Sequence, residues 1–226
     1  MSLLQPEEWQ ALRLTLAVAA RAVGFGLPVA VLLAWVLARG RFRGRGLLNA
    51  IVHMPLVLPP VVTGWLLLLL FGIRGPVGVL LLHWFGLRLV FTTAGASLAC
   101  AVMTLPLMVR SIRLAIESVD PALEQAARSL GAGRLDRFLT ITLPLAAPGV
   151  LAGAVIAYAA SLGEFGAVIT FAADIPGETR TLPLAIYGAL QVPGGEAQAA
   201  RLSLVSVVLA LAGLGASEWL NRRMRR

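Results

Sequence analysis

The chain contains no lysine: all 19 of its basic residues are arginine, against 11 acidic residues in 226 positions. Charged residues make up only 13%, about half of the roughly 25% that soluble domains carry, whereas hydrophobic residues make up 58% and the mean hydropathy is +0.85. This scarcity of charge indicates an integral membrane protein. The missing lysine excludes a phosphate-binding loop of the G-x-x-x-x-G-K-[ST] type, because that lysine contacts the phosphates. If ATP drives this protein, another subunit must bind the ATP.

Groups that could serve catalysis or metal binding are also scarce. The single cysteine, Cys100, lies within an apolar run, so no internal disulfide can form. The two histidines, His53 and His83, are predicted at different depths of the membrane, and neither has a carboxylate at the spacing of a zinc site such as H-E-x-x-H. The sequence therefore predicts no catalytic residue and no metal site, and it disfavours a membrane-embedded enzyme.

Long apolar stretches predict the architecture. A membrane span needs about 20 mainly apolar residues, and five segments qualify: Leu12–Leu37, Leu48–Phe71, Thr92–Met108, Pro148–Phe171 and Leu202–Leu220. A sixth stretch, Val77–Val90, is shorter and is interrupted by His83 and Arg88, so we expect an interfacial helix on the outer surface. Residues 1–226 are expected to form one all-α transmembrane domain, since no length remains for a separate soluble module.

Prolines and glycines modify two of these spans. Pro55, Pro59 and Pro60 each remove a backbone donor from the second span, which predicts a kinked helix. Gly149 and Gly153, four residues apart in the fourth span, permit close helix packing. These features suit spans that move, although packing alone also explains them.

The distribution of arginine predicts the topology. One set of loops and ends holds thirteen arginines: Arg39, Arg41, Arg43, Arg45, Arg110, Arg113, Arg128, Arg134, Arg137, Arg222, Arg223, Arg225 and Arg226. The opposite set holds four: Arg74, Arg88, Arg180 and Arg201. The positive-inside rule places the first set in the cytoplasm, so we expect the amino terminus outside and the carboxyl terminus inside. The same clustering beside spans argues against nucleic acid as a partner, despite a net charge of +8.

The polar segment between the third and fourth spans, about residues 110–147, predicts two short helices. Asp120 and Pro121 supply an N-cap and a first helical residue, and an apolar face then recurs at helical spacing through Leu123, Ala126, Ala127 and Leu130. Gly131 and Gly133 end this helix, and a second one is expected over Leu135–Ile141. Two short helices that meet at a glycine would form a compact protrusion, which we call the elbow (residues 120–144).

The elbow resembles the coupling motif of ABC importer permeases, E-A-A-x3-G-x9-I-x-L-P. The residues that match it in register are Ala126, Ala127, Gly131, Ile141, Leu143 and Pro144. The position of the motif's glutamate holds Gln125, and the acid lies one place earlier, at Glu124. A shift of one residue turns a side chain by about 100° around a helix. We therefore expect a hydrogen bond from Gln125 to replace the family's charged contact.

This resemblance implies the partners. In such a permease the elbow docks into a cleft of a cytoplasmic ABC ATPase, and closure of two ATPase subunits moves two elbows. The resemblance implies a homodimer, because one chain carries the full motif, together with two ATPase subunits and a periplasmic oxyanion-binding protein. ATP and magnesium would be bound by the ATPase, so no cofactor is expected on this chain.

Three further stretches resemble molybdate importer permeases: Met54–Gly64, Ser161–Ala167 and Ile175–Tyr187. The resemblance covers nearly the whole chain, and the short, five-span length suits this family better than the longer sulfate permeases. It implies molybdate or tungstate transport across a bacterial inner membrane. A permease for sulfate, thiosulfate or another oxyanion is the alternative within the same class. A secondary transporter or a channel is the alternative from a different class, but neither needs the elbow.

An importer of a dianion should avoid tight binding in its pore, and no arginine lies in spans two to five. The candidates for the translocation pathway or gate are hydroxyls and one acid: Thr63, Ser97, Thr104, Ser161, Thr170 and Glu164. Hydroxyls inside helices also commonly bond to their own backbone. For Glu164 we expect a structural or gating role, paired with Arg21 or Arg201.

The predicted outer loop Ala173–Ala200 carries charges of both signs around an apolar helix, Leu182–Gln191. Asp174, Glu178 and Arg180 are candidates for docking the binding protein. An ordinary solvated loop is the competing interpretation.

Overall fold

The structure is a computed structural model that describes residues 4–224; for Leu214 and residues 216–224 it describes the backbone alone. The arginines at 225 and 226, part of the predicted cytoplasmic carboxyl terminus, lie outside the described residues. Within that range the chain is helical and contains no strand. The order is α1 (Pro6–Arg39), α2 (Arg45–Val57), α3 (Pro60–Phe71), α4 (Pro76–Phe85), α5 (Thr93–Glu117), α6 (Pro121–Ser129), α7 (Arg134–Arg137), the π-helix η1 (Phe138–Thr142), α8 (Leu143–Leu162), α9 (Gly166–Ala172), α10 (Leu182–Leu190) and α11 (Glu196–Met224).

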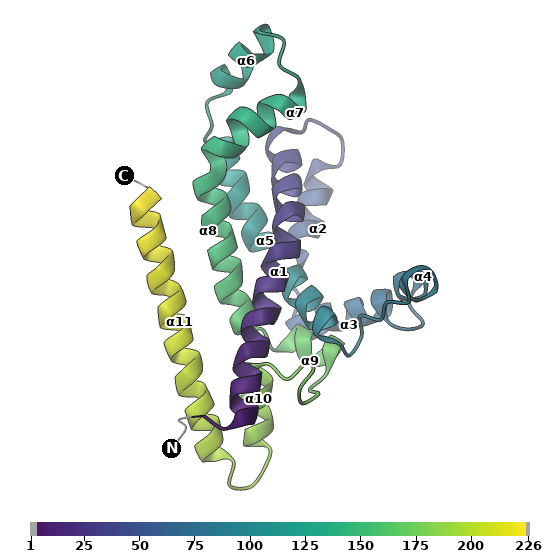
Figure 1. Cartoon of the computed structure of the whole chain (residues 1–226). Coiled ribbons are helices and arrows are strands. Elements are labelled where there is room, and N and C mark those ends of the chain that lie inside the picture. Colours follow the sequence, from purple (N-terminus) through teal and green to yellow (C-terminus); the bar gives the residue numbers. More distant parts are fainter. Residues whose placement is uncertain (1–3, 225–226) are drawn as a thin grey trace.

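Four helical stretches are long and apolar enough to cross a membrane. They are α1, α5, the continuous run Arg134–Leu162 through α7, η1 and α8, and Glu196–Gly213 within α11. The pair α2 and α3 is a fifth candidate span, bent by 119° at its break. Figure 1 shows α1, α5 and α8 side by side, with α11 beside them and the elbow helices α6 and α7 at one end. The all-α, roughly five-span architecture is confirmed.

The helices α1, α5 and α8 pack closely because small residues line their contacts. Ala30, Ala34 and Ala157 are fully buried in a cluster with larger side chains such as Met108 and Ile112. The predicted close packing at Gly149 is present, since a Cβ there would collide with Ala115 of α5. The Ser111 hydroxyl of α5 also donates a 2.9 Å hydrogen bond to the Gly149 carbonyl. Neighbouring backbones are therefore in direct contact on the elbow half of the bundle.

The second predicted span, Leu48–Phe71, is not one kinked helix but two helices separated by Leu58 and Pro59. Leu58 is extended, with φ −73° and ψ 143°, and Pro59 is extended as well. A residue before proline is pushed out of the helical region by the proline ring, and here two successive prolines impose this on two successive residues. The prediction of a kink was too weak: the adjacent prolines end α2 and restart the chain as α3.

The fourth predicted span, Pro148–Phe171, is wrong at both ends. Its helix continues from the elbow without interruption and stops at Leu162, after which residues 163–165 separate it from α9. The second elbow helix, predicted over Leu135–Ile141, is α7 followed by the π-turn η1 that leads directly into α8. Pro144 does not mark a break: it lies directly after the π-turn η1, and the helix continues through it.

The sixth apolar stretch forms α4, a short helix of its own. In Figure 1, α3 and α4 extend sideways from the bundle, away from α11. The predicted apolar helix of the outer loop is present as α10, which packs beside α11.

Candidate functional site

The first elbow helix, α6, begins and ends as its sequence dictates. The Asp120 carboxylate accepts a 2.8 Å hydrogen bond from the Ala122 N–H, and Pro121 occupies the first turn. At the other end Gly131 has φ +90°, its N–H bonds to the Arg128 carbonyl, and the N–H of Ala132 bonds to the Ala127 carbonyl. These two bonds form a Schellman motif, which needs a residue in the left-handed conformation. Gly131, the glycine of the coupling motif, is therefore suited to its position because glycine adopts the left-handed conformation without strain.

The apolar face of the elbow is exposed. Leu130 is 88% exposed and Leu123 46%, and Gln125 and Ala126 beside them are also exposed. Figure 1 places α6 at the extreme end of the molecule, beyond the ends of the long helices. The elbow therefore presents two exposed leucines beside Gln125 and Ala126 at the end of the molecule.

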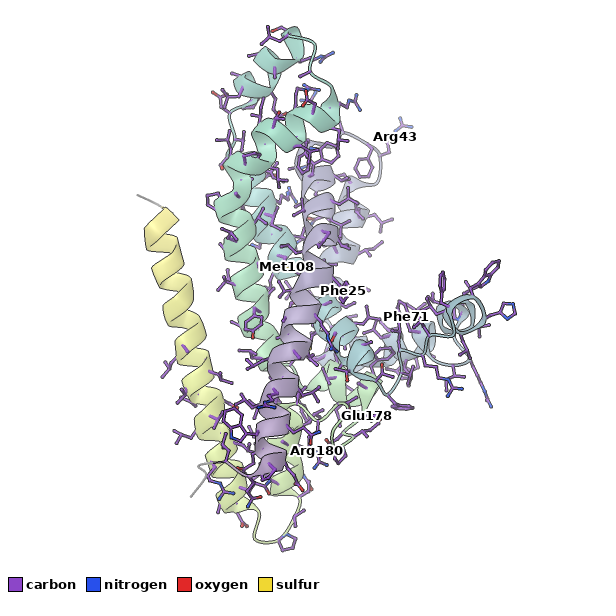
Figure 2. The ribbon with its side chains drawn as sticks, viewed as in Figure 1. Phe25, Arg43, Phe71, Met108, Glu178 and Arg180 are labelled. Carbon is purple, nitrogen blue, oxygen red and sulfur yellow. The ribbon has the colours of Figure 1, made fainter. Side chains whose placement is uncertain are left out.

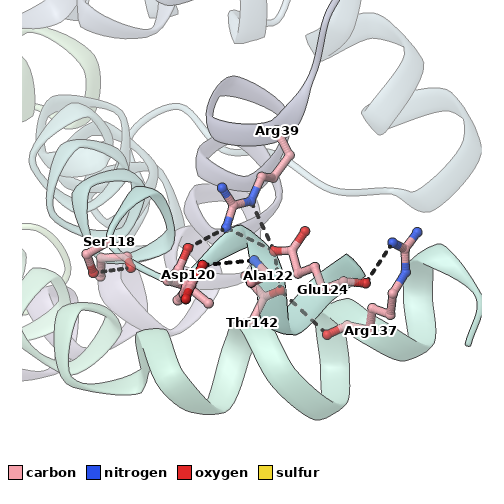
Figure 3. A network of polar contacts seen from close by, with 9 residues as sticks. Arg39, Ser118, Asp120, Ala122, Glu124, Arg137 and Thr142 are labelled. Carbon is pink, nitrogen blue, oxygen red and sulfur yellow. Dashed lines mark hydrogen bonds and ion pairs between the residues drawn. The ribbon is translucent and has the colours of Figure 1, made fainter. Parts of the chain in front are cut away.

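Glu124 faces the opposite way and joins three segments of the chain. Its Oε1 accepts hydrogen bonds from Arg39 Nε at 3.0 Å and from the Thr142 hydroxyl at 2.9 Å. Arg39 Nη2 lies 3.0 Å from the same oxygen and also donates to the Val119 carbonyl, and Arg137 Nη1 donates to the Glu124 carbonyl at 3.3 Å. Figure 3 shows this network between the end of α1, the elbow and η1. The acid that stands one place early in the motif thus stabilises the elbow internally, while Gln125 occupies the free surface.

The rest of the motif anchors the elbow to the bundle. Ile141 lies in η1, and Leu143 and Pro144 open α8. Beside them Phe138 is buried and packs on Trp35 of α1, with ring centroids 4.7 Å apart. Because α7, η1 and α8 are continuous and Glu124 is tied to α1, displacement of the elbow would displace both long helices. The arrangement can transmit a rigid-body motion.

The predicted pathway hydroxyls are buried or half-buried, but four of the five bond to their own helices. Ser97, Thr104, Ser161 and Thr170 each donate to a carbonyl four residues earlier, at 2.8 Å. Only Thr63 of α3 is buried with no hydrogen-bond partner for its hydroxyl. Thr63 therefore differs from the other four, which match the backbone-bonded alternative, and it shares its unpartnered buried hydroxyl with Thr181 before α10.

The predicted pairing of Glu164 with Arg21 or Arg201 is wrong. Glu164 lies in the break after α8, and its Oε1 accepts a 3.0 Å hydrogen bond from the Ala167 N–H at the start of α9. Arg201 pairs instead with Glu8, at 2.9 Å, and Arg21 is exposed. Glu164 thus acts as a local cap for α9, a role that its spacing of three residues from Ala167 permits.

The two broken spans meet at two glycines. A Cβ on Gly64 of α3 would lie 2.8 Å from both the Ala167 carbonyl oxygen and the Thr170 Cβ of α9. A Cβ on Gly166 of α9 would lie 2.7 Å from the Pro60 Cβ. The breaks at Pro59 and at Gly163 therefore place α3 against α9 with their backbones nearly in contact. This contact, whose Gly64 directly follows Thr63 in the chain, is the candidate for a gate.

The predicted docking residues lie at the end of the molecule far from the elbow (Figure 2). Arg180 forms two hydrogen bonds with Asp174, at 2.7 and 3.1 Å, so these two charges largely satisfy each other. Glu178 is exposed, and its carbonyl accepts a 2.7 Å hydrogen bond from the Thr93 hydroxyl at the start of α5. The loop is held in place by these bonds, and of the three predicted docking residues Glu178 is the one without an ion pair.

A set of polar contacts between distant segments at this far end was not predicted from the sequence. Glu8 is 1% exposed, paired with Arg201 of α11 and bonded to the Gln5 N–H at 2.8 Å. Thr15 accepts a 2.7 Å hydrogen bond from the N–H of Leu182 in α10. The only signal in the sequence is an acid directly before the first predicted span. Among the side chains that the structure describes, no group of three or more His, Cys, Asp or Glu is placed to hold a metal ion.

Residues 26–226 match the family of binding-protein-dependent transport system inner membrane components. The chain belongs to this family. It is 56% identical over 223 residues to the molybdenum transport system permease protein ModB of Escherichia coli (strain K12), which covers 99% of this chain and 97% of that protein. It is 52% identical over 219 residues to ModB of Haemophilus influenzae, with 97% and 96% covered. These relatives are transport permeases rather than enzymes, and the chain is accordingly a multi-pass inner-membrane permease.

Solved structures agree with the fold. The chain superposes with a TM-score of 0.76 on a chain of a bacterial alginate ABC transporter in complex with an alginate-bound periplasmic protein, covering 97% of this chain and 80% of that one at 22% identity. The family match and the identity to ModB confirm the resemblance to ABC importer permeases that the elbow motif first indicated.

Proposed function

We propose that this permease forms the translocation pathway for molybdate or tungstate in an ABC importer. The observation that carries the proposal is the 56% identity to a molybdenum permease over 99% of the chain. The side chains of the described spans are compatible with an oxyanion that binds weakly in the pathway and is then released. The helices α3 and α9 contain no arginine, and the Thr63 hydroxyl of α3 has no hydrogen-bond partner.

ATP-driven motion would enter through the elbow. In this proposal the exposed face with Gln125, Ala126 and Leu130 docks on a cytoplasmic ABC ATPase, which binds ATP and magnesium. Glu124 and Arg39 then pass the motion to α1, and the continuous α7–η1–α8 run passes it to α8. The far end of α8 lies directly before α9, so the motion reaches the contact between α3 and α9.

The proposed assembly is a homodimer of this chain with two ATPase subunits and a periplasmic oxyanion-binding protein. The elbow lies in the cytoplasm, and the start of α1 and the loop with Glu178 lie outside. Supporting this orientation, the arginine-rich loop 39–45 and the elbow share one end of the bundle (Figure 1). Docking of the binding protein would use Glu178 with the Asp174–Arg180 pair as a fixed support.

The test is uptake into vesicles that contain the permease, its ATPase and its binding protein. We expect ATP-dependent accumulation of molybdate and tungstate, and little of sulfate. Preferential uptake of sulfate would contradict the substrate. A permease with the elbow sequence scrambled should bind no ATPase and show no ATP-dependent uptake. Uptake that still required ATP hydrolysis in the scrambled variant would contradict the coupling route.

A further inference from the structure

A pocket of about 560 Å³ lies between the end of α1 and the inner side of the elbow. A second pocket, of about 380 Å³, adjoins it and shares most of its charged residues. The charged residues that line the larger pocket are Arg39, Arg41, Glu124, Arg128, Arg134 and Arg137. Five guanidinium groups thus face one carboxylate, which gives the lining a large excess of positive charge.

Much of this positive charge is unneutralised. Glu124 is already paired with Arg39, and Arg137 donates its bonds to the carbonyls of Gly133 and Glu124. Among the described residues, no carboxylate lies within ion-pair distance of Arg41, Arg128 or Arg134. Clustered guanidinium groups repel one another, so a pocket of this composition favours an anion.

The floor of the same pocket is apolar. Trp35, Val36 and Phe138 line it, and Trp35 and Phe138 pack on each other. These residues belong to the last turns of α1 and to η1, next to the arginines of the elbow and of the loop after α1. The pocket therefore combines a cationic rim with an aromatic floor, a composition typical of membrane interfaces.

We propose that this pocket binds the phosphate headgroup of an anionic phospholipid. The arginines of the elbow and of the loop after α1 would contact the phosphate, and Trp35 and Phe138 the glycerol and upper acyl carbons. Basic pockets between spans on the cytoplasmic side bind such headgroups. A free tetrahedral oxyanion would contact only part of a cavity of about 560 Å³ and would leave its apolar floor without a partner.

This lipid would bridge α1 and the elbow at the junction that Glu124 and Arg39 hold. It would therefore stiffen the connection between the elbow and the bundle. The inference concerns binding by this chain alone and does not depend on which solute is transported.

The test measures lipid binding to the purified full-length protein in a non-ionic detergent by native mass spectrometry. Phosphatidylglycerol and phosphatidylcholine with the same acyl chains are the probes. The variant R128Q/R134Q removes two of the unneutralised arginines. We expect its affinity for phosphatidylglycerol to fall by about 30-fold, which is about 2 kcal/mol, while binding of phosphatidylcholine stays weak and unchanged.

The matched control is R43Q/R110Q, which removes the same charge from the same end of the molecule. Both arginines are exposed and line neither pocket, and Figure 2 shows Arg43 pointing away from the bundle. The control should keep the affinity for phosphatidylglycerol within about threefold of wild type. An equal loss in the control would overturn the proposal, because general surface charge would then explain binding. Displacement of phosphatidylglycerol by millimolar inorganic phosphate would overturn it as well, since the site would then prefer a free anion.

Discussion

Glu124 occupies a position where one carboxylate contacts two other segments of the chain. Its partners Arg39 and Thr142 come from the end of α1 and from η1, and the Arg39 and Glu124 side chains are only 24% and 22% exposed. Charge-assisted hydrogen bonds at this burial are stronger than those of an open surface pair. The ion pair between Arg39 and Glu124 is therefore expected to fix the orientation of the elbow relative to α1.

Glu124→Gln should weaken this junction and lower the amount of oxyanion taken up per ATP hydrolysed. Arg39→Gln should do the same, and the double variant should be little worse than either single one, because both remove one shared interaction. The expected coupling energy is about 1 kcal/mol. The control is Glu117→Gln, which removes an acid at the same end that pairs with Arg113. Additive losses in the double variant would show that Arg39 and Glu124 act independently.

Gly131 and Gly133 differ in what their backbones demand. Gly131 has φ +90° in the Schellman motif, whereas Gly133 has φ −67° and open space around it. Gly131→Ala should cost about 1–2 kcal/mol and weaken ATPase association by about tenfold, because an alanine in the left-handed region is strained. Gly133→Ala should leave association within about threefold of wild type. Binding of the purified ATPase to each variant measures this, and equal losses at both positions would contradict the role of the turn.

At the scale of elements, the sequence predicted the ends of individual helices more accurately than the limits of membrane spans. The cap at Asp120 and the stop at Gly131 were predictable because each depends on neighbours within four residues. The break at Pro59 was underestimated, since one proline kinks a helix whereas two in succession end it. The break at Gly163 was not predicted, because the apolar run continues through it. Hydropathy alone does not indicate where a helix is interrupted. The π-turn η1 adds one residue to a helical turn and has no signal in composition.

The contact between α3 and α9 depends on the absence of side chains. Gly64→Ala should abolish or strongly reduce transport, because its Cβ would lie 2.8 Å from the Ala167 carbonyl oxygen. Overpacking of this kind costs about 1–3 kcal/mol. Gly24→Ala in α1, where no atom lies within 4 Å of the added methyl group, is the matched control and should retain transport. Uptake and thermal stability of both variants test this prediction. Wild-type uptake by Gly64→Ala would exclude close contact between α3 and α9 at Gly64.

For the whole molecule, composition alone predicted a membrane protein without catalytic machinery, and the elbow motif indicated its class. The direction of Glu124 could not be predicted, because it depends on Arg39, which lies 85 residues away in sequence. The same holds for Glu8 and Arg201, which are 193 residues apart. Hydroxyl-bearing residues were candidates for a pathway on polarity alone, and the structure separates Thr63 from the others by its missing hydrogen bond. Contacts between distant segments therefore set the limit of what the sequence could predict.

Transport by the whole assembly should depend on two leucines that the isolated chain leaves in the open. Leu123→Asp combined with Leu130→Asp places charge on the exposed elbow face without disturbing a buried contact, since these side chains are 46% and 88% exposed. Burial of two such leucines at an interface contributes about 3 kcal/mol, so ATPase association should weaken by roughly 100-fold and uptake should cease. Val192→Asp, at a 60% exposed position at the far end, is the control and should keep full ATPase association. Co-purification of the ATPase with each variant, at equal permease levels in the membrane, measures the effect. If the double variant kept its ATPase, another surface of the permease would have to receive the motion.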